Sequence, residues 1–300
     1  MPAPVSRLRT WLQLVRAPNL FTVPGDPIAG YLLSNDGFTD FSLALVALAC
    51  LCFYAAGLLM NDVVDLAEDT AERPNRPLPA GHASPTSALK ATWILNALGI
   101  VLLIFTQSTR SLFAGLFLVA FVWLYNNRTK HIPLLGAMNM GICRGLSIMV
   151  GAYAGPSPSA ALIVSVFAIV VTFYIAAVTN LARFETAPSI PAFPRLLPIL
   201  PLCIGCVFGA RNATYAPDKT PAAAIFFLAI FGGILLMQRL LSKNAPPLPP
   251  LVGAHIRLLL PLQAAICWLG ASQSSGPTWA IIFLCCWPLS KIVSRRFYAS

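Results

Sequence analysis

Long apolar segments follow one another along almost the whole chain, and they constrain the fold more than any other feature of this sequence. Ten candidate helices are expected, near residues 18–34, 42–60, 88–106, 111–125, 135–154, 160–182, 195–210, 221–241, 257–272 and 278–293. In lipid, backbone polar groups must be satisfied within each segment, so runs of this length form helices. Several are shorter than the roughly 20 residues of a straight span, and Pro288 interrupts the last one. Nine or ten spans are therefore both compatible with the sequence.

The scarcity of charge excludes a soluble all-α protein. Only 10% of the residues are charged and the mean hydropathy is +0.75, whereas soluble domains carry about 25% charged residues. We therefore expect an all-α, polytopic membrane helical bundle that forms a single domain over residues 1–300. The first apolar stretch contains Pro18, Pro24 and Pro27 and lacks a convincing small-residue cleavage site. We expect it to be a membrane helix and not a cleavable signal peptide.

The distribution of basic residues predicts the orientation. If the spans alternate, seventeen of the twenty Lys and Arg residues fall on the side of the N-terminus, and only Arg110, Arg211 and Lys219 fall on the other. By the positive-inside rule the N-terminus is cytoplasmic, and we expect a multi-pass protein of a bacterial inner membrane. The net charge of +10 then reflects this bias and attraction to anionic lipid. No compact basic domain indicates nucleic-acid binding. His82, His131 and His255 are expected in cytoplasmic loops.

One stretch, residues 61–81, concentrates the acidic residues at the end of an apolar helix. It holds five of the ten in the chain, namely Asp62, Asp65, Glu68, Asp69 and Glu72. Asn61, Asp65 and Asp69 are four residues apart, so they line one face of a continuing helix. Stacked like charges repel unless a cation neutralises them, and Mg²⁺ is typically held by one or two carboxylates plus substrate phosphate oxygens. This spacing indicates a magnesium site.

Two arginines, Arg73 and Arg76, follow the acidic residues and can hold the phosphate oxygens that magnesium leaves free. Pro74, Pro77 and Pro79 end the helix and stiffen the loop that presents them. An acidic stripe, an arginine pair and a membrane border together indicate a site for a diphosphate with an apolar tail.

The pattern Asn61-Asp62-x-x-Asp65-x-x-x-Asp69, followed by RPNRPLPAG from Arg73, resembles the first aspartate-rich motif of the UbiA prenyltransferase superfamily. Other elements agree in order: Arg16-Ala-Pro-Asn19 with the family's opening Arg-Pro element, Tyr125 and Lys130 with its tyrosine–lysine loop, and Asn139 and Arg144 with the polar face of its fifth helix. The resemblance covers residues 16–185 and rests on topology beyond them.

This resemblance implies a UbiA-like, Mg²⁺-dependent membrane prenyltransferase that moves a prenyl group from a prenyl diphosphate to a hydrophobic acceptor, aromatic or cyclic. Asp62, Asp65 and Asp69 would be catalytic and, with Asn61, would bind the metal. Substrate contacts are expected from Asn19, Arg73, Arg76, Tyr125, Lys130, Arg144, Asn180 and Arg183. An arginine within a span, such as Arg144, is costly unless paired or solvated, so a structural ion pair is the alternative there.

The sequence departs from the family where a second aspartate-rich motif is expected, between the sixth and seventh helices. Residues 179–188 (TNLARFETAP) contain no aspartate and offer Asn180, Arg183 and Glu185. Glu185 could hold one metal ion while Arg183 replaces the charge of another, an arrangement similar to the EboC-type branch of the superfamily. Two alternatives stay open: a non-catalytic polyprenyl-lipid-binding or assembly subunit, and a transporter. A single acidic cluster is atypical of the paired broken helices of transporters.

Overall fold

The computed structural model describes residues 6–155, 161–185, 187, 189–214, 217–242, 247–270 and 275–297, and within these ranges the chain contains helices and no strand. The α-helices are α1 (Arg7–Leu14), α2 (Gly25–Ser34), α3 (Phe41–Val64), α4 (Leu66–Glu72), α5 (Pro85–Phe105), α6 (Thr109–Asn127), α7 (Pro133–Ala152), α8 (Ala161–Ala182), α9 (Ala192–Leu196), α10 (Ile199–Ala213), α11 (Thr220–Leu241), α12 (Leu248–Arg257), α13 (Leu259–Leu269) and α14 (Ser275–Phe297). Three short 3₁₀ helices are η1 (Ala17–Thr22), η2 (Thr129–His131) and η3 (Pro217–Lys219). The prediction of an all-α fold is confirmed.

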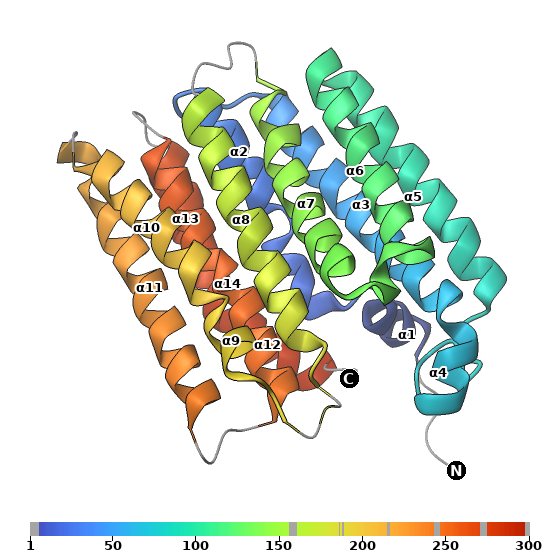
Figure 1. The fold of residues 1–300 in the computed structure, drawn as a ribbon. Helices are drawn as coiled ribbons and strands as arrows, with labels where there is room; N and C mark the ends of the chain where they lie inside the picture. The colour runs from blue at the N-terminus through green and yellow to red at the C-terminus, as the bar shows by residue number, and fades with distance from the viewer. Residues whose placement is uncertain are drawn as a thin grey trace.

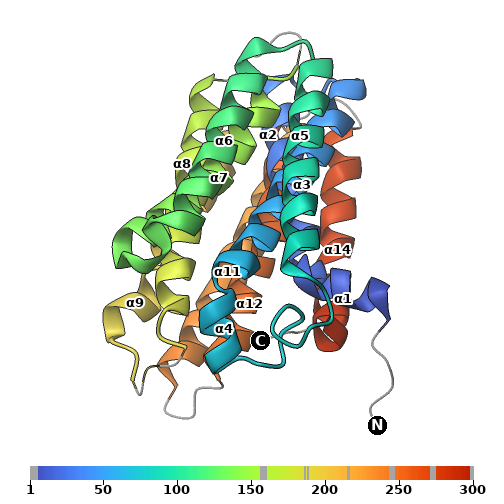
Figure 2. The same ribbon diagram turned by 90° about the vertical axis from the view of Figure 1, so that its right-hand side faces the viewer.

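The long helices run side by side as a bundle, and the short helices α1, α4, α9 and α12 gather at one of its ends (Figures 1 and 2). We call this end the α4 end. It carries the acidic stretch, because α4 continues from the last residues of α3. The sequence-predicted motif therefore lies where the membrane-depth part of the bundle ends.

Within the described ranges, nine stretches are long and apolar enough to cross a membrane. They are α3, α5, α6, α7, α8, α9 with α10, η3 with α11, α12 with α13, and α14. Large apolar side chains such as Trp93, Phe105 and Phe117 are exposed on α5 and α6, as expected for surfaces that face lipid. The chain is thus an integral membrane protein.

The first predicted span, residues 18–34, is not one continuous helix. The chain forms η1 up to Thr22, and α2 begins only at Gly25. Proline lacks an N–H and disfavours a helical conformation in the residue before it. Pro24 accordingly lies between η1 and α2, while Pro18 and Pro27 lie in the first turns of these two helices. All ten residues of α2 are buried. The first predicted span is therefore absent from the nine stretches, whereas the last one, which Pro288 interrupts, is α14 and is among them.

The expectation for His255 was wrong. It lies within α12 with 2% of its surface exposed, and its backbone oxygen accepts a hydrogen bond from Tyr174 Oη at 2.7 Å. The predicted span began at residue 257, but α12 already begins at Leu248. Pro249, Pro250 and His255 interrupt the apolar pattern of this segment, so the hydropathy of the sequence placed the beginning of the helix too late.

Helix α7 lies at the centre of the bundle, packed against α2, α6 and α8 (Figure 1). Small residues allow the close approach to α8. A Cβ added to Gly141 would lie 2.1 Å from Thr172 O, and one added to Gly145 would lie 2.9 Å from Ala168 O. Small residues at helix contacts are typical of membrane bundles, where backbones approach closely. The backbone of α7 is therefore packed closely against α8, and its polar side chains project from this fixed backbone.

Candidate active site

The acidic motif spans the junction of α3 and α4, where Asp65 leaves the helical conformation with ψ near 2° but backbone hydrogen bonds of the helical type continue. Asp65 N donates to Asn61 O at 2.9 Å, Asp69 N donates to Asp65 O at 2.8 Å, and Arg73 N donates to Asp69 O at 2.8 Å. These i to i−4 bonds keep the four residues on one face. The spacing of the sequence predicts this face, and the structure has it.

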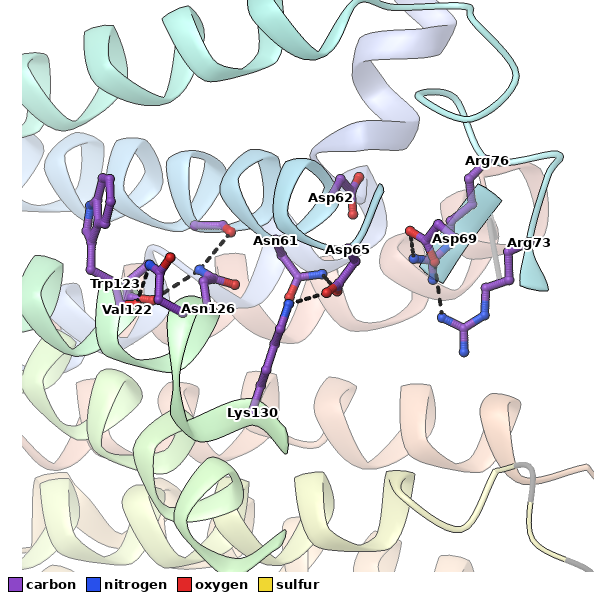
Figure 3. Close-up of polar contacts among 12 residues, drawn as sticks. Asn61, Asp62, Asp65, Asp69, Arg73, Arg76, Val122, Trp123, Asn126 and Lys130 are labelled. Carbon is purple, nitrogen blue, oxygen red and sulfur yellow. Dashed lines mark hydrogen bonds and ion pairs between the residues drawn. The ribbon is translucent and has the colours of Figure 1, made fainter. Parts of the chain in front are cut away.

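Asp65 lies at the centre of the motif and faces the loop between α6 and α7. Asn61 Nδ2 donates to Asp65 Oδ2 at 2.9 Å, and Lys130 Nζ forms an ion pair with Asp65 Oδ1. Figure 3 shows the Asn61, Asp65 and Lys130 side chains converging. Lys130 is 7% exposed, so this charge pair is shielded from bulk water and from salt screening.

The other two aspartates also face basic side chains. Arg76 Nη1 donates to Asp69 Oδ2 at 2.7 Å, and Arg73 Nη1 lies 3.6 Å from Asp69 Oδ1. Asp62 points to another side of the helix (Figure 3), where its Oδ1 lies 3.9 Å from Arg16 Nη2. The motif is thus surrounded by cations that reach it from η1, η2 and the proline-rich loop.

Glu185, after α8, belongs to the same electrostatic environment. Partial burial raises the pKa of its carboxyl, while the charges of Arg73 and Arg16 lower it. The acids around the mouth are then Asp62, Asp65, Asp69 and Glu185, and the bases are Arg16, Arg73, Arg76 and Lys130. The formal charges of these eight side chains therefore sum to zero before any substrate binds.

A small apolar cluster holds the cation-bearing segments in place. Leu78 of the proline-rich loop packs with Leu14 of α1, Leu59 of α3 and Ala88 of α5, and all four are at most 5% exposed. Burial of each large apolar side chain contributes about 1.5–3 kcal/mol. The cluster therefore anchors both the loop that carries Arg73 and Arg76 and the segment that leads to Arg16.

The loop that carries Lys130 is docked on α7. With the amide of Asn139 oriented to satisfy its neighbours, its Nδ2 donates to Phe121 O at 3.0 Å, and its Oδ1 accepts from Thr129 Oγ1 at 2.9 Å and Tyr125 N at 3.3 Å. A Cβ added to Gly136 would lie 2.8 Å from Thr129 O, so only glycine permits this approach. Asn139 thus supports the loop instead of facing the motif.

An apolar cavity of about 130 Å³, within about 750 Å³ of empty space that includes its open mouth, extends inward from the motif between α3, α6 and α7. Arg16, Asn61 and Tyr125 line it together with apolar side chains such as Phe53 and Leu118. The Tyr125 hydroxyl is within electrostatic range of Arg16 and Asp65. A polar group bound at the motif could therefore place an apolar tail in this cavity.

Arg144 also lines the cavity, but the structure pairs it with Asp26 of α2. Arg144 Nε lies 2.7 Å from Asp26 Oδ2, and Asp26 is fully buried. Gln263 of α13 donates to Asp26 Oδ1 at 2.6 Å and to Thr22 O at 2.8 Å. This is the structural ion pair that the sequence left as an alternative for Arg144, and it connects α2, α7 and α13.

Three other predicted substrate residues are not brought against the motif by the contacts of the described residues. Asn19 lies in η1, where its backbone N donates to Arg16 O. Arg183 Nη1 donates to Asn180 Oδ1 at 3.2 Å. Asn180 lines a different, lipid-facing groove between α7, α8, α9 and α10. Of the altered second motif, Glu185 is the residue that faces the charged mouth.

The donor set suits magnesium in one particular mode. Among the described residues no three His, Cys, Asp or Glu side chains converge on one point. Mg²⁺ commonly binds one or two carboxylates and completes its shell with water and substrate phosphates. Asn61 and Asp65, whose side chains are in contact, are the residues that could share such a site with substrate phosphates, while Asp62 lies on another side of the helix.

Fold and site together define a polytopic membrane protein with a charged pocket for an anionic headgroup at the mouth of an apolar cavity. Residues 27–189 match the UbiA prenyltransferase family. The chain belongs to this family, which confirms the resemblance inferred from its motifs.

Archaeal relatives show the same likeness. The chain is 30% identical to a digeranylgeranylglyceryl phosphate synthase of Methanocaldococcus jannaschii over 50% of this chain and 53% of the relative. It is 26% identical to one of Natronomonas pharaonis over 90% of this chain and 94% of the relative. The aligned region thus spans about half the length of the first of these relatives.

Solved structures share the fold. A structure of a UbiA homologue from Archaeoglobus fulgidus bound to GPP and Mg²⁺ has a TM-score of 0.60 at 15% identity, covering 86% of this chain and 99% of that one. The structure of a digeranylgeranylglyceryl phosphate synthase has a TM-score of 0.63 at 21% identity, covering 87% and 98%.

Sequence reasoning missed the contribution of Arg16, Asp26 and Gln263. Arg16 was noted only for its resemblance to the family's opening element, although a basic residue at the membrane border could have been paired with Asp62. Asp26 was detectable as a lone acid among apolar residues, which requires a buried partner. Gln263 gave no signal beyond being an amide within a span.

Proposed function

We propose that this protein is a Mg²⁺-dependent prenyltransferase that takes its prenyl group from a prenyl diphosphate. The observation that carries the proposal is the aspartate face of Asn61, Asp65 and Asp69, which lies opposite basic side chains at the mouth of an apolar cavity. A diphosphate headgroup requires cations, and a prenyl tail requires an apolar channel; both are present within one site.

In the proposed reaction, the C1–O bond of the allylic diphosphate breaks and its electron pair leaves with the diphosphate oxygen. Lys130, Arg73 and Arg76 stabilise the departing negative charge through ionic hydrogen bonds. Asn61, Asp62, Asp65 and Asp69 are the residues that would hold Mg²⁺, which supplies charge neutralisation for the leaving group when bound. The acceptor then forms a bond to C1 and releases its proton to diphosphate or water.

The substrate is expected to enter sideways from the bilayer. Moving a prenyl chain out of lipid costs about 0.8 kcal/mol per CH₂ group, so a route through water is unfavourable for a long chain. The cavity's apolar lining and its position between membrane-depth helices support this route. The positive-inside pattern supports a cytoplasmic mouth and N-terminus. The archaeal origin of the relatives lends no support to our expectation of a bacterial inner membrane.

The acceptor is proposed by class. The resemblance implies an aromatic or cyclic acceptor, whereas the names of the archaeal relatives point to a glyceryl phosphate that already carries one prenyl chain. Both are hydrophobic molecules with a polar end. The altered second motif, in which Glu185 stands without aspartates, keeps open whether one metal ion or two take part.

The test is incubation of the purified protein with radiolabelled geranyl, farnesyl and geranylgeranyl diphosphates, with and without Mg²⁺. Each reaction receives either 4-hydroxybenzoate or geranylgeranylglyceryl phosphate, followed by lipid extraction. We expect Mg²⁺-dependent release of diphosphate and a labelled product with one of the acceptors. Tight Mg²⁺-dependent binding of a prenyl diphosphate with no turnover would indicate the non-catalytic lipid binder, and flux into proteoliposomes would indicate a transporter.

A further inference from the structure

The side chain of Asn126 presents a buried oxygen that the protein does not satisfy. Asn126 is 2% exposed, and its Nδ2 donates to Val122 O at 3.0 Å and to Gly57 O at 3.3 Å. Both partners are carbonyls, so the amide orientation is fixed and Oδ1 points away from them. This Oδ1 is enclosed and has no hydrogen-bond partner among the described residues. Buried polar atoms are normally paired, so this one indicates a missing partner.

The residue lies where a reacting group would be. Asn126 lines the same cavity as Asn61 and Gly57, and Gly57 is four residues before Asn61 in α3. Asn126 is therefore about one helical turn, roughly 5.4 Å, deeper than the motif. Figure 3 shows its amide between α3 and α6, next to the Asn61–Asp65–Lys130 group. With a diphosphate at Asn61 and Asp65, the first carbons of the prenyl chain would lie beside Asn126.

The charge of the cavity restricts which donor this oxygen can take. Arg16 and Arg144 line the cavity, and no carboxylate is among its described lining residues. Both arginines are already paired with carboxylates, Arg16 with Asp62 and Arg144 with Asp26, so a cationic donor such as an ammonium group would lose its hydration in the apolar surroundings without a counter-ion. A neutral hydroxyl does not carry this cost.

We propose that Asn126 is an acceptor-binding residue whose Oδ1 accepts a hydrogen bond from a hydroxyl group of the prenyl acceptor. The inference rests on the proposed function for the position of the prenyl diphosphate. The amide is too weak a base to take the proton. It orients the O–H so that the acceptor faces C1, and the proton leaves with the released diphosphate or to water. Asn126 therefore selects acceptors that carry a hydroxyl close to the attacking atom.

The neighbouring residue provides a matched control. Asn127 Nδ2 makes the same bond one residue later, to Trp123 O at 2.9 Å, but Asn127 is exposed and does not line the cavity. Asn126→Ala removes the proposed contact, and Asn127→Ala removes only a local helix contact. Asn126→Ser is the second variant if Asn126→Ala fails to fold, because a serine hydroxyl can still bond to Val122 O while its oxygen is withdrawn from the cavity.

The experiment measures the equilibrium binding of geranylgeranylglyceryl phosphate and of 4-hydroxybenzoate to each detergent-purified variant, with a Mg²⁺–geranylgeranyl diphosphate binding curve beside it. One neutral hydrogen bond corresponds to a change of about two- to tenfold. We expect Asn126→Ala and Asn126→Ser to weaken the binding of at least one hydroxyl probe by about that factor. The prenyl diphosphate Kd should be unchanged, and Asn127→Ala should match the wild type.

Three results would overturn the assignment. Equal losses for the hydroxyl probe and the prenyl diphosphate would show a structural role, and unchanged binding of both probes would show that Oδ1 holds only water. Binding of neither probe to the wild type would refute a hydroxyl acceptor of these two kinds at Asn126. Binding is measured without turnover, so a wild type that binds the probes but releases no diphosphate refutes the proposed function alone.

Discussion

Replacing Gly136 with alanine should reduce turnover more than it reduces stability. An added Cβ would lie 2.8 Å from Thr129 O and 3.1 Å from Lys130 Cα, against an ordinary contact that begins near 3.4 Å. The difference, 3.4 minus 2.8, requires η2 to recede by about 0.6 Å. Both neighbours are backbone atoms, so no side chain can rotate away, and the ion pair of Lys130 with Asp65 moves with the loop.

The expected magnitude follows from this displacement. A misplacement of 1 Å at a catalytic group can cost about 100-fold in rate, so a shift of about 0.6 Å predicts a loss of about tenfold in kcat/KM for a prenyl diphosphate. Alanine in place of a helical glycine gains about 0.5–1 kcal/mol of helix propensity. This gain offsets part of the packing cost, which is about 1–3 kcal/mol for an overpacked contact, so the melting temperature should fall only modestly.

The assay is Mg²⁺-dependent diphosphate release by purified protein in detergent, with a thermal unfolding curve for each variant. Gly232→Ala is the matched control. Gly232 is also a helical glycine, in α11, but a Cβ added there would contact only the flexible end of the Leu258 side chain, at 2.8 Å. If Gly136→Ala retains wild-type kcat/KM, or if Gly232→Ala loses as much activity, the docking of η2 does not control the position of Lys130.

Other predictions address the charges. Asp65→Ala and Asp62→Ala should each abolish turnover while membrane insertion persists, which product formation by the purified variants would contradict. Arg144→Leu should lower the free energy of unfolding by about 3–5 kcal/mol, because it leaves Asp26 buried and unpaired; the double variant with Asp26→Leu should recover most of the loss in thermal unfolding. Removing Mg²⁺ with EDTA should abolish the thermal stabilisation given by geranyl diphosphate, and a shift that persists would contradict the shared metal site. Burial raises the pKa of Glu185, so as pH falls its carboxylate becomes neutral at a higher pH than an exposed glutamate would. Glu185→Gln should therefore flatten the acid limb of the pH–rate profile. An unchanged acid limb would show that Glu185 is not part of the site.

Much of the fold was predictable, because the solvent is lipid. A helix that must satisfy its own backbone leaves a long apolar run in the sequence, and α3, α5, α6, α7 and α11 were expected within a few residues of their ends. The exceptions share a physical cause. Proline divided the first span, and Pro249 and Pro250, together with His255, made the first part of α12 resemble a connector.

The candidate site was predictable where it is local in sequence. The face of Asn61, Asp65 and Asp69 follows from helical spacing, and Arg73 and Arg76 follow within the same run. The contacts of Arg16 and Glu185 join segments far apart in the chain, and single-sequence spacing carries no information on such distances. The same holds for Asp26, whose partner Arg144 is 118 residues away.

The balance of four acids and four bases at the mouth has a consequence for how a ligand is captured. The three aspartates of the motif are already paired with Arg16, Lys130, Arg73 and Arg76, so the protein without ligand supplies its own counter-ions. A metal ion that bound alone would take the aspartates and leave the lysine and the arginines without counter-ions. A diphosphate that bound alone would take these cations and leave the aspartates unpaired. We expect both to be accepted only as one complex, in a single exchange of partners that keeps every charge compensated.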